Sequence, residues 1–333
     1  MPPPRKPSRK DPRLSTLSTK KAISVPVHPP APASASNGTK SAAAGRKAAV
    51  GGAGTKSAGM PDVQGSSDTR HIAIDRVGVK DVTYPIKLKV SPCSMEGGGE
   101  QTTVAKINMY VSLPHYQKGT HMSRFLEVLN DRQGGAGGGA ISPNDIPKIT
   151  EAIRERLNAE EAHFEAEFTY FISKPAPVTG APGLMNYRVR FDCTASKSGK
   201  TDDFQMAVAA PATSLCPCSK EISAYGAHNQ RCEIEAKVRM KGLMWIEELA
   251  RIIEKSASCP VYAVLKRPDE KFVTEAAYDN PKFVEDIIRD LALMLNKEAR
   301  ILSYEISSEN FESIHNHNAY AQIRRDKRRA GER

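Results

Sequence analysis

The chain has 333 residues, enough for one large domain or two of ordinary size, and 39% of them are hydrophobic. Its formal net charge is +10, but residues 1–60 hold 11 Lys or Arg and a single acid, Asp11, so the remainder carries no net charge. This balance argues against a folded basic face for nucleic acid. A nucleic-acid-binding protein that uses the basic N-terminus is kept only as an alternative.

Residues 1–65 are rich in Pro, Ala, Ser, Gly and Lys and contain almost no large apolar side chains. Such a segment cannot bury enough surface to fold, so we expect a disordered tail. No apolar run is long enough for a signal peptide or a membrane span, and we expect a soluble, cytoplasmic protein without a membrane partner. The six cysteines follow no secreted disulfide spacing and are expected to be reduced thiols.

The next part of the chain is predicted to have the element order ββααββ. Alternation of apolar and polar residues indicates strands, and apolar residues three and four positions apart indicate helices. Thr120 is placed to cap the first helix, whose apolar stripe includes Phe125 and Leu129. In chain order, the elements are strands 82–90 and 102–113, a helix after residue 120, a helix at 142–158, and strands 162–174 and 185–194.

The same order is predicted a second time. Asn280 is placed to cap the later helix of this unit, and Pro281 takes its first position. A short apolar piece at 261–265, between the two helices, is an extra strand or a connector and has no assigned place. The predicted fold is therefore α+β, with two tandem ββααββ units at 66–198 and 199–333. In chain order, the elements of the second unit are strands 204–210 and 232–240, helices 243–254 and 281–295, and strands 301–307 and 319–324.

The long connection between the strands at 204–210 and 232–240 contains the densest cluster of reactive side chains. Cys216 and Cys218 are separated by one proline, which is too tight for a CxxC pair, and this argues against a structural zinc site. One thiolate with an imidazole and a carboxylate would fit a catalytic metal that keeps a position open for water. Buried thiols beside a loop histidine, His228, are the alternative interpretation.

Further candidates lie downstream of this connection. Glu285 falls in the first turn of its predicted helix, where the helix dipole favours an acid without any ligand. His315 and His317 alternate near a predicted strand start, so at most one of them is expected to point into any given site.

Five short stretches make the sequence resemble the GTP cyclohydrolase type IB family, from about residue 75 to residue 325. They are VGVK at 77–80, YPI at 84–86, LPHYQKGTHMSR at 113–124, CPCSK at 216–220 and YGAHNQR at 225–231. The tail, the glycine-rich stretch at 134–139 and the loop around 174–183 depart from the family pattern, and none of them touches these motifs. The resemblance implies a tunnelling fold and a homotetramer with active sites at subunit interfaces, built mostly from the second unit.

The resemblance also implies roles for single residues. Cys218, His228 and Glu270 resemble the ligands of one divalent metal ion, zinc or manganese with iron as a further option, and Cys216 is the alternative for the important thiol. His315 resembles a catalytic histidine near that ion. Glu285 resembles the family's guanine anchor, since a carboxylate can accept two hydrogen bonds from the N1–H and 2-amino edge of guanine. Lys118, His121 and Arg124 suit the triphosphate of the substrate.

The reaction implied is hydrolytic opening of the guanine ring of GTP, with loss of C8 as formate and formation of 7,8-dihydroneopterin triphosphate, the first step of tetrahydrofolate biosynthesis. No nucleic-acid partner is expected. The nearest rival is a nitrile reductase of the same fold, in which a nucleophilic cysteine such as Cys218 would act without a metal ion.

Overall fold

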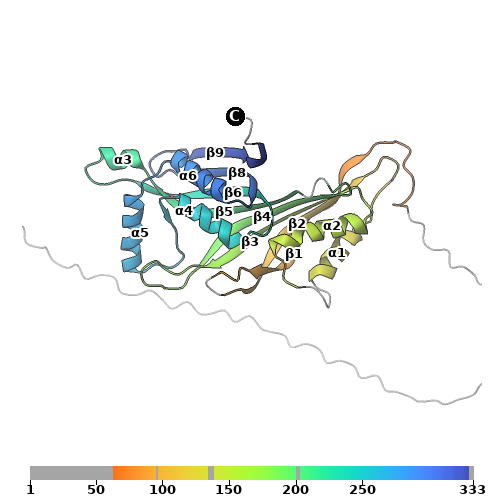
Figure 1. Cartoon of the computed structure of the whole chain (residues 1–333), viewed down its shortest axis with the longest axis horizontal. Coiled ribbons are helices and arrows are strands. Elements are labelled where there is room, and N and C mark those ends of the chain that lie inside the picture. Colours follow the sequence, from red (N-terminus) through yellow and green to blue (C-terminus); the bar gives the residue numbers. More distant parts are fainter. Residues whose placement is uncertain (1–62, 95–96, 134–138, 200–202, 330–333) are drawn as a thin grey trace, which may run out of the picture. The chain divides into compact units, whose positions relative to one another are not determined.

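The structure is a computed structural model, and it describes residues 63–94, 97–133, 139–199 and 203–329. Within these ranges nine strands form one antiparallel sheet, accompanied by six α-helices (Figure 1). The strand order is β1-β2-β3-β4-β5-β6-β8-β9, and β7 pairs with the end of β5.

Each strand predicted from alternation is confirmed, because a sheet with one buried face leaves a period of two in the sequence. The strands are β1 (Ile74–Val90), β2 (Gly99–Leu113), β3 (Glu161–Ser173), β4 (Leu184–Ser196), β5 (Asp203–Leu215), β6 (Asn229–Met240), β7 (Cys259–Pro260), β8 (Ile301–Asn310) and β9 (Ala319–Asp326). The helices are α1 (Ser123–Gln133), α2 (Ile146–Arg156), α3 (Pro217–Ile222), α4 (Ile246–Ser256), α5 (Arg267–Asp279) and α6 (Val284–Lys297).

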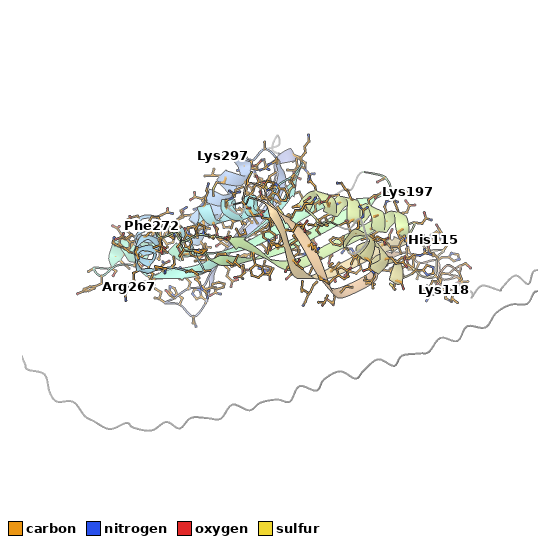
Figure 2. All side chains as sticks on the ribbon, turned by 90° about the horizontal axis from the view of Figure 1, so that it is seen from below. His115, Lys118, Lys197, Arg267, Phe272 and Lys297 are labelled. Carbon is orange, nitrogen blue, oxygen red and sulfur yellow. The ribbon has the colours of Figure 1, made fainter. Side chains whose placement is uncertain are left out.

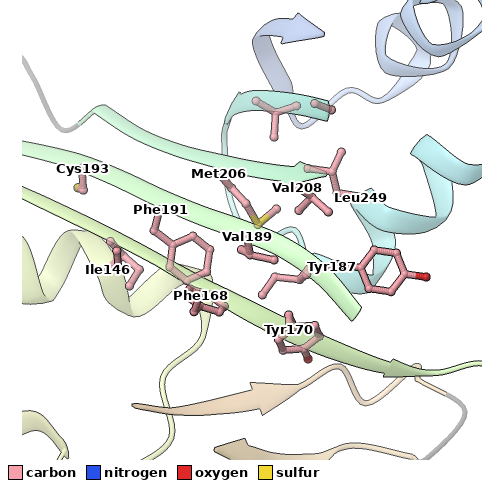
Figure 3. Packing of buried hydrophobic residues seen from close by; sticks show 14 of the residues in the cluster. Ile146, Phe168, Tyr170, Tyr187, Val189, Phe191, Cys193, Met206, Val208 and Leu249 are labelled. Atoms are coloured by element: carbon pink, nitrogen blue, oxygen red, sulfur yellow. The ribbon is translucent and has the colours of Figure 1, made fainter. Parts of the chain in front are cut away.

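The core lies between the sheet and three of these helices. Helix α2 packs on β3 and β4, α4 on β5 and β6, and α6 on β8 and β9. Phe168 and Phe191 meet edge to face, with ring centroids 5.2 Å apart, between Ile146 of α2 and Leu249 of α4 (Figure 3). Alternate residues of the same strands, such as Arg188 on β4, are exposed on the opposite face.

The predicted α+β tunnelling fold of two tandem ββααββ units is wrong. The first half has that order, but in the second half α3 follows β5, and both β7 and α5 separate α4 from α6. Strand β4 also pairs with β5, so one continuous sheet runs through both halves. Helix α3 has six residues, none of them buried, and so leaves no apolar stripe in the sequence.

Two predicted helix starts are also wrong. Thr120 is buried, and α1 begins later, at Ser123. Helix α6 begins at Val284 rather than at Pro281, and the Asp286 carboxylate accepts a hydrogen bond of 3.0 Å from the Phe283 N–H. The Asn280 side chain instead donates to the carbonyls that follow α4, and it ties the end of α5 to the end of α4.

Gly78 gives the VGVK motif a physical reason. A Cβ atom at this position would lie 2.0 Å from the carbonyl oxygen of Met109, so only glycine fits at this point of the β1–β2 pair. The pairing register shifts just beyond it, and Asp81 takes a φ of 56° while its N–H donates to Asn108 Oδ1 at 2.8 Å. This irregularity bends β1 against β2.

Strands β1 and β9 form the two edges of the sheet, since each has one strand partner in the described part of the chain. Ile141 covers the outer edge of β1 at residues 87–89. The predicted tail lies outside the described residues as far as residue 62. The unit boundary predicted at 198 and 199 stays a prediction. Among the residues described, no helix is long and apolar enough to cross a membrane.

Candidate functional site

Cys216 and His228 lie side by side where β5 ends and β6 begins. The Cys216 N–H donates to the His228 carbonyl at 3.2 Å, and the His228 N–H donates to Ser219 Oγ at 3.2 Å. The Ser219 hydroxyl in turn donates to the Cys216 carbonyl at 3.1 Å. The long connection predicted from the sequence therefore forms a closed loop, and Cys216 and His228 lie where its two ends meet.

The two thiols of this connection have different surroundings. Cys216 is half-buried and precedes α3, where its Sγ accepts a hydrogen bond of 3.4 Å from the Ser219 N–H. Cys218 lies within α3 and is exposed. Cys193, Cys232 and Cys259 are buried, and burial raises the pKa of Cys232 to about 12, so this thiol stays protonated.

The hydrogen bonds around His228 decide which of its nitrogens can bind a ligand. The Gln230 amide nitrogen donates to the Glu312 carboxylate at 3.3 Å, which turns Gln230 Oε1 toward His228 Nδ1 at 2.8 Å. An amide oxygen only accepts, so Nδ1 carries the proton in the neutral ring. The lone pair of Nε2 is then available for a metal or a proton.

The segment at 311–317 joins this cluster. The Phe311 N–H donates to the Arg231 carbonyl at 3.0 Å, and Ser313 Oγ lies 3.2 Å from His228 Nδ1. His315 follows two residues later. Its ring stacks on that of His317 with centroids 5.2 Å apart, in the turn before β9. The strand alternation expected for these two histidines is therefore wrong, because neither lies in a strand.

The N-terminus of α6 lies at the same end of the sheet. The Lys282 N–H donates to the Leu215 carbonyl at 3.0 Å, and Ser214 Oγ donates to the Lys282 carbonyl at 3.0 Å. Glu285 is in the first turn of the helix that follows, and its side chain is exposed. One chain thus brings Cys216, Cys218, His228, the His315 segment and the start of α6 to one end of the sheet.

Glu270 is not brought to the thiols. It is exposed in the first turn of α5, whereas the last turn of α5 contacts α3, with Lys220 Nζ 2.5 Å from the Tyr278 carbonyl. Eight residues of helix separate Glu270 from Tyr278, a rise of about 12 Å. Across the described ranges, no three His, Cys, Asp or Glu side chains are grouped closely enough to hold a metal ion.

The start of α5 is fixed by Asp269, a residue that the sequence did not single out. Its buried carboxylate accepts hydrogen bonds from the N–H groups of Val178, Thr179 and Lys266, each at 2.9 Å, and from Thr179 Oγ at 2.6 Å. Burial by itself would raise the pKa of Asp269, but these hydrogen bonds lower it below its usual value. The loop at 174–183 therefore anchors the turn that carries Glu270.

Lys118, His121 and Arg124 lie at the opposite end of the sheet. They follow Leu113 at the end of β2. Residue pairs between neighbouring strands connect this end of β2 with the start of β5, so both lie at the same end of the sheet. The pairs are Val111–Ala162, Ala162–Ala195 and Thr194–Asp203. Cys216 follows the other end of β5, whose 13 residues span about 40 Å. Figure 2 shows this separation, with Lys118 and Arg267 at opposite ends.

The loop that carries these basic residues is held by the segment that precedes β1. The Lys118 N–H donates to the Ser66 carbonyl at 3.0 Å, and the Gly119 N–H donates to the Gln64 carbonyl at 3.0 Å. The rings of His71 and His115 lie 5.9 Å apart beside it. The sequence did not indicate His71, because its place depends on this pairing between segments far apart in the chain.

Residues 60–321 match the family model described as "Type I GTP cyclohydrolase folE2". The chain belongs to this family. "GTP cyclohydrolase FolE2" of Azoarcus sp. (strain BH72) is 53% identical over 269 residues, which cover 81% of this chain and 96% of the relative. "GTP cyclohydrolase FolE2" of Magnetococcus marinus is 53% identical over 264 residues, or 79% of this chain and 95% of the relative. The resemblance read from the motifs is confirmed, and the matched range of this type I GTP cyclohydrolase family member contains every candidate site residue.

Among solved structures, the family member shows weak similarity to two uricases. The uricase from Bacillus fastidious has a TM-score of 0.44 and 9% identity, over 77% of this chain and 94% of that one. The uricase from Arthrobacter globiformis has a TM-score of 0.39 and 8% identity, over 75% of this chain and 93% of that one.

Proposed function

We propose that this GTP cyclohydrolase of folate biosynthesis hydrolyses the guanine ring of GTP at C8, releases formate and forms 7,8-dihydroneopterin triphosphate. The observation that carries the proposal is the backbone hydrogen bond between Cys216 and His228, which places a thiol and an imidazole at the base of one loop in a chain that belongs to the folE2 family. We place the reaction in the cytoplasm.

The proposal includes one divalent metal ion, zinc, manganese or iron, held by His228, by Cys218 or Cys216, and by Glu270. A thiolate and an imidazole with a free Nε2 are suitable donors for all three metals. When bound, the ion supplies a hydroxide near neutral pH. The contacts of Cys216 with the His228 loop favour Cys216 as the thiol ligand. A complete ligand set needs a second copy of the chain, or a movement of α5, because one chain leaves Glu270 away from the pair.

The chain's own side chains have separate tasks in this proposal. Gln230 keeps the proton on His228 Nδ1 and so leaves Nε2 open. His315, exposed beside that cluster, moves protons during ring opening. The Glu285 carboxylate accepts the N1–H and 2-amino donors of guanine, a pair that adenine lacks.

Lys118, His121 and Arg124 bind the triphosphate, and we propose that a second subunit supplies them. A separation of about 40 Å along β5 is too large for one GTP molecule to span within one chain. The thiol end also exposes large apolar side chains, which mark protein interfaces when they gather. They are Ile222, Tyr225, Phe283, Phe311 and Ile314. A homotetramer with interface active sites accounts for both observations.

The test is to incubate the purified, metal-stripped protein with GTP and zinc, manganese or iron, and to identify the product by mass. We expect dihydroneopterin triphosphate and formate only when metal is present. Turnover of GTP without metal, abolished by thiol alkylation, would contradict the metal-dependent proposal.

A further inference from the structure

A pocket of about 200 Å³ lies between α4, the ends of β3 and β4, and the turn after β1. Its walls are mostly apolar, and charged side chains from α4 line one side. None of the residues proposed above for GTP or metal lines it. The lining residues include Cys93, Ile172, Lys174, Pro175, Ala250 and Arg251, together with Glu247 and Glu254 of α4.

Helix α4 buries two carboxylates among side chains that are mostly apolar. Glu254 is 7% exposed, and its Oε1 accepts hydrogen bonds from Tyr187 Oη at 2.6 Å and from Lys174 Nζ at 2.8 Å. Lys174 also donates to the Val261 carbonyl at 3.0 Å. The charge of Glu254 is therefore balanced within the chain.

In contrast to Glu254, Glu247 forms no ion pair with a Lys or Arg side chain within the described ranges. It is 3% exposed, and its Oε1 accepts hydrogen bonds from the Ser91 N–H at 2.9 Å and from Tyr170 Oη at 2.7 Å. Its Oε2 is buried and has no hydrogen-bond partner among the residues described. A buried carboxylate oxygen without a donor is costly, and native structures supply such a group with a partner, a water or a ligand.

We propose that this pocket binds a small organic cation, an amidinium or protonated amine on a flat apolar body, whose N–H group donates to Glu247. The apolar walls at Ile172, Pro175 and Ala250 suit the body of such a ligand. Lys174 is engaged with Glu254, and Arg251 Nε donates to the Glu247 backbone carbonyl at 3.2 Å, so among the described residues no Lys or Arg side chain forms an ion pair with the Glu247 carboxylate. Its size restricts the ligand to a single ring or a short chain. This proposal does not rest on the proposed GTP chemistry.

The probe is benzamidinium, a flat cation of about nine non-hydrogen atoms, and acetophenone is the neutral control of equal size without an N–H donor. We expect titration calorimetry on the full-length protein to give a dissociation constant for benzamidinium of about 1 mM or tighter. Acetophenone should bind at least about tenfold more weakly. Glu247→Gln should weaken benzamidinium about tenfold or more, because a hydrogen bond to a charged group is lost. Glu155→Gln, an exposed acid on α2, is the matched control and should change nothing.

A second measurement uses the wild-type chain and does not depend on whether the variant folds. Cys93 is exposed and lines the pocket, whereas Cys218 is exposed elsewhere. Benzamidinium should slow alkylation of Cys93, followed by peptide mass, at least about threefold, and leave Cys218 unaffected. Equal binding of acetophenone, binding that survives Glu247→Gln in a folded protein, or unprotected Cys93 at saturating benzamidinium would each overturn the proposal.

Discussion

The two ends of the sheet differ in chemistry and in how firmly the chain prepares them. At the end of β5, backbone and side-chain hydrogen bonds hold a thiol and an imidazole in one arrangement and leave Nε2 of His228 open. Beyond the end of β2, the exposed side chains of Lys118 and Arg124 come from a loop and from the first turn of α1. In the proposed function, the thiol end carries out the chemistry and the end of β2 binds the triphosphate. Under that proposal, a single chain carries two halves of a site that do not meet within it.

The largest effect is expected from damage to the thiol–imidazole end. His228→Ala should lower turnover of GTP about a thousandfold or more and reduce bound metal, because it removes a ligand. The measurements are turnover and metal content by mass spectrometry. Cys232→Ala is the control, since it removes a buried thiol of β6 and should cost stability through a small cavity while turnover stays intact. If His228→Ala keeps both its activity and its metal, the thiol–imidazole end is not the site of the chemistry.

Single substitutions sharpen the roles within that end. Whichever of Cys216→Ala and Cys218→Ala removes the metal identifies the ligand, and the contacts of Cys216 favour Cys216. His315→Ala should keep most of the metal and still lose ring opening, because its proposed task is proton transfer. Metal analysis and turnover on the same samples separate a ligand from a proton carrier. Loss of metal in His315→Ala would make it a ligand instead.

Subunit mixing tests whether the two ends meet between chains. His228→Ala and the double variant Lys118→Ala, Arg124→Ala should each be nearly inactive alone. After co-refolding in equal amounts, turnover should return to about a quarter of the wild-type value, because that fraction of interfaces pairs two intact ends. A mixture of His228→Ala with the double variant Cys216→Ala, Cys218→Ala, both damaged at the same end, is the control and should stay inactive. No recovery in the first mixture would place both ends in one chain's site.

Glu285→Gln should weaken GTP about a hundredfold without loss of metal. A site built to accept two donors discriminates steeply when one acceptor becomes a donor. Equilibrium binding of GTP and metal analysis provide the measurements. Glu221→Gln, another exposed acid at the same end of the sheet, serves as the control. If Glu285→Gln loses metal and keeps affinity for GTP, the guanine role is wrong.

A smaller effect is expected from Asp269→Asn, which changes the first turn of α5, where Glu270 lies. The amide places a donor where Thr179 and Lys266 already donate, so the loop at 174–183 should loosen from α5. We expect turnover to fall about tenfold and the melting temperature to fall by about 3 °C. Glu275→Gln on the exposed face of α5 should change neither. Normal turnover in Asp269→Asn would separate the loop anchor from the chemistry.

The smallest effect is expected from the N-terminal tail. Deleting residues 1–60, which lie outside the described ranges, should leave turnover within about twofold and preserve the assembly, because this segment has almost no apolar surface to contribute. Turnover and sedimentation measure both properties. Dissociation of the shortened protein would assign the tail a part in the interface.

Eight of the nine described strands could be predicted, because each records its own half-buried environment as a local period of two, whereas β7 has only two residues and shows no such period. Helix α3 and the start of α5 could not, since a six-residue helix has no apolar stripe and α5 begins on a loop anchor 90 residues away at Thr179. Local sequence patterns also limited what could be predicted of the site. Motifs identified Cys216 and His228, whereas the orientation of Gln230 depends on Glu312, which lies 82 residues further along the chain. Contacts of that range leave no periodic trace in a sequence.

Strand β1 is 17 residues long, and in the described part of the chain its outer edge is paired at residues 87–89, by Ile141. A long open edge can recruit any other extended chain, the first step toward aggregation. This edge carries exposed lysines at 80, 87 and 89 and a kink at Asp81, and the opposite edge, β9, carries Arg324 and Arg325. Two copies of the β1 edge would bring these lysines close together, and like charges on adjacent strands disfavour such pairing. The lysines therefore make uncontrolled edge-to-edge association of two chains less favourable.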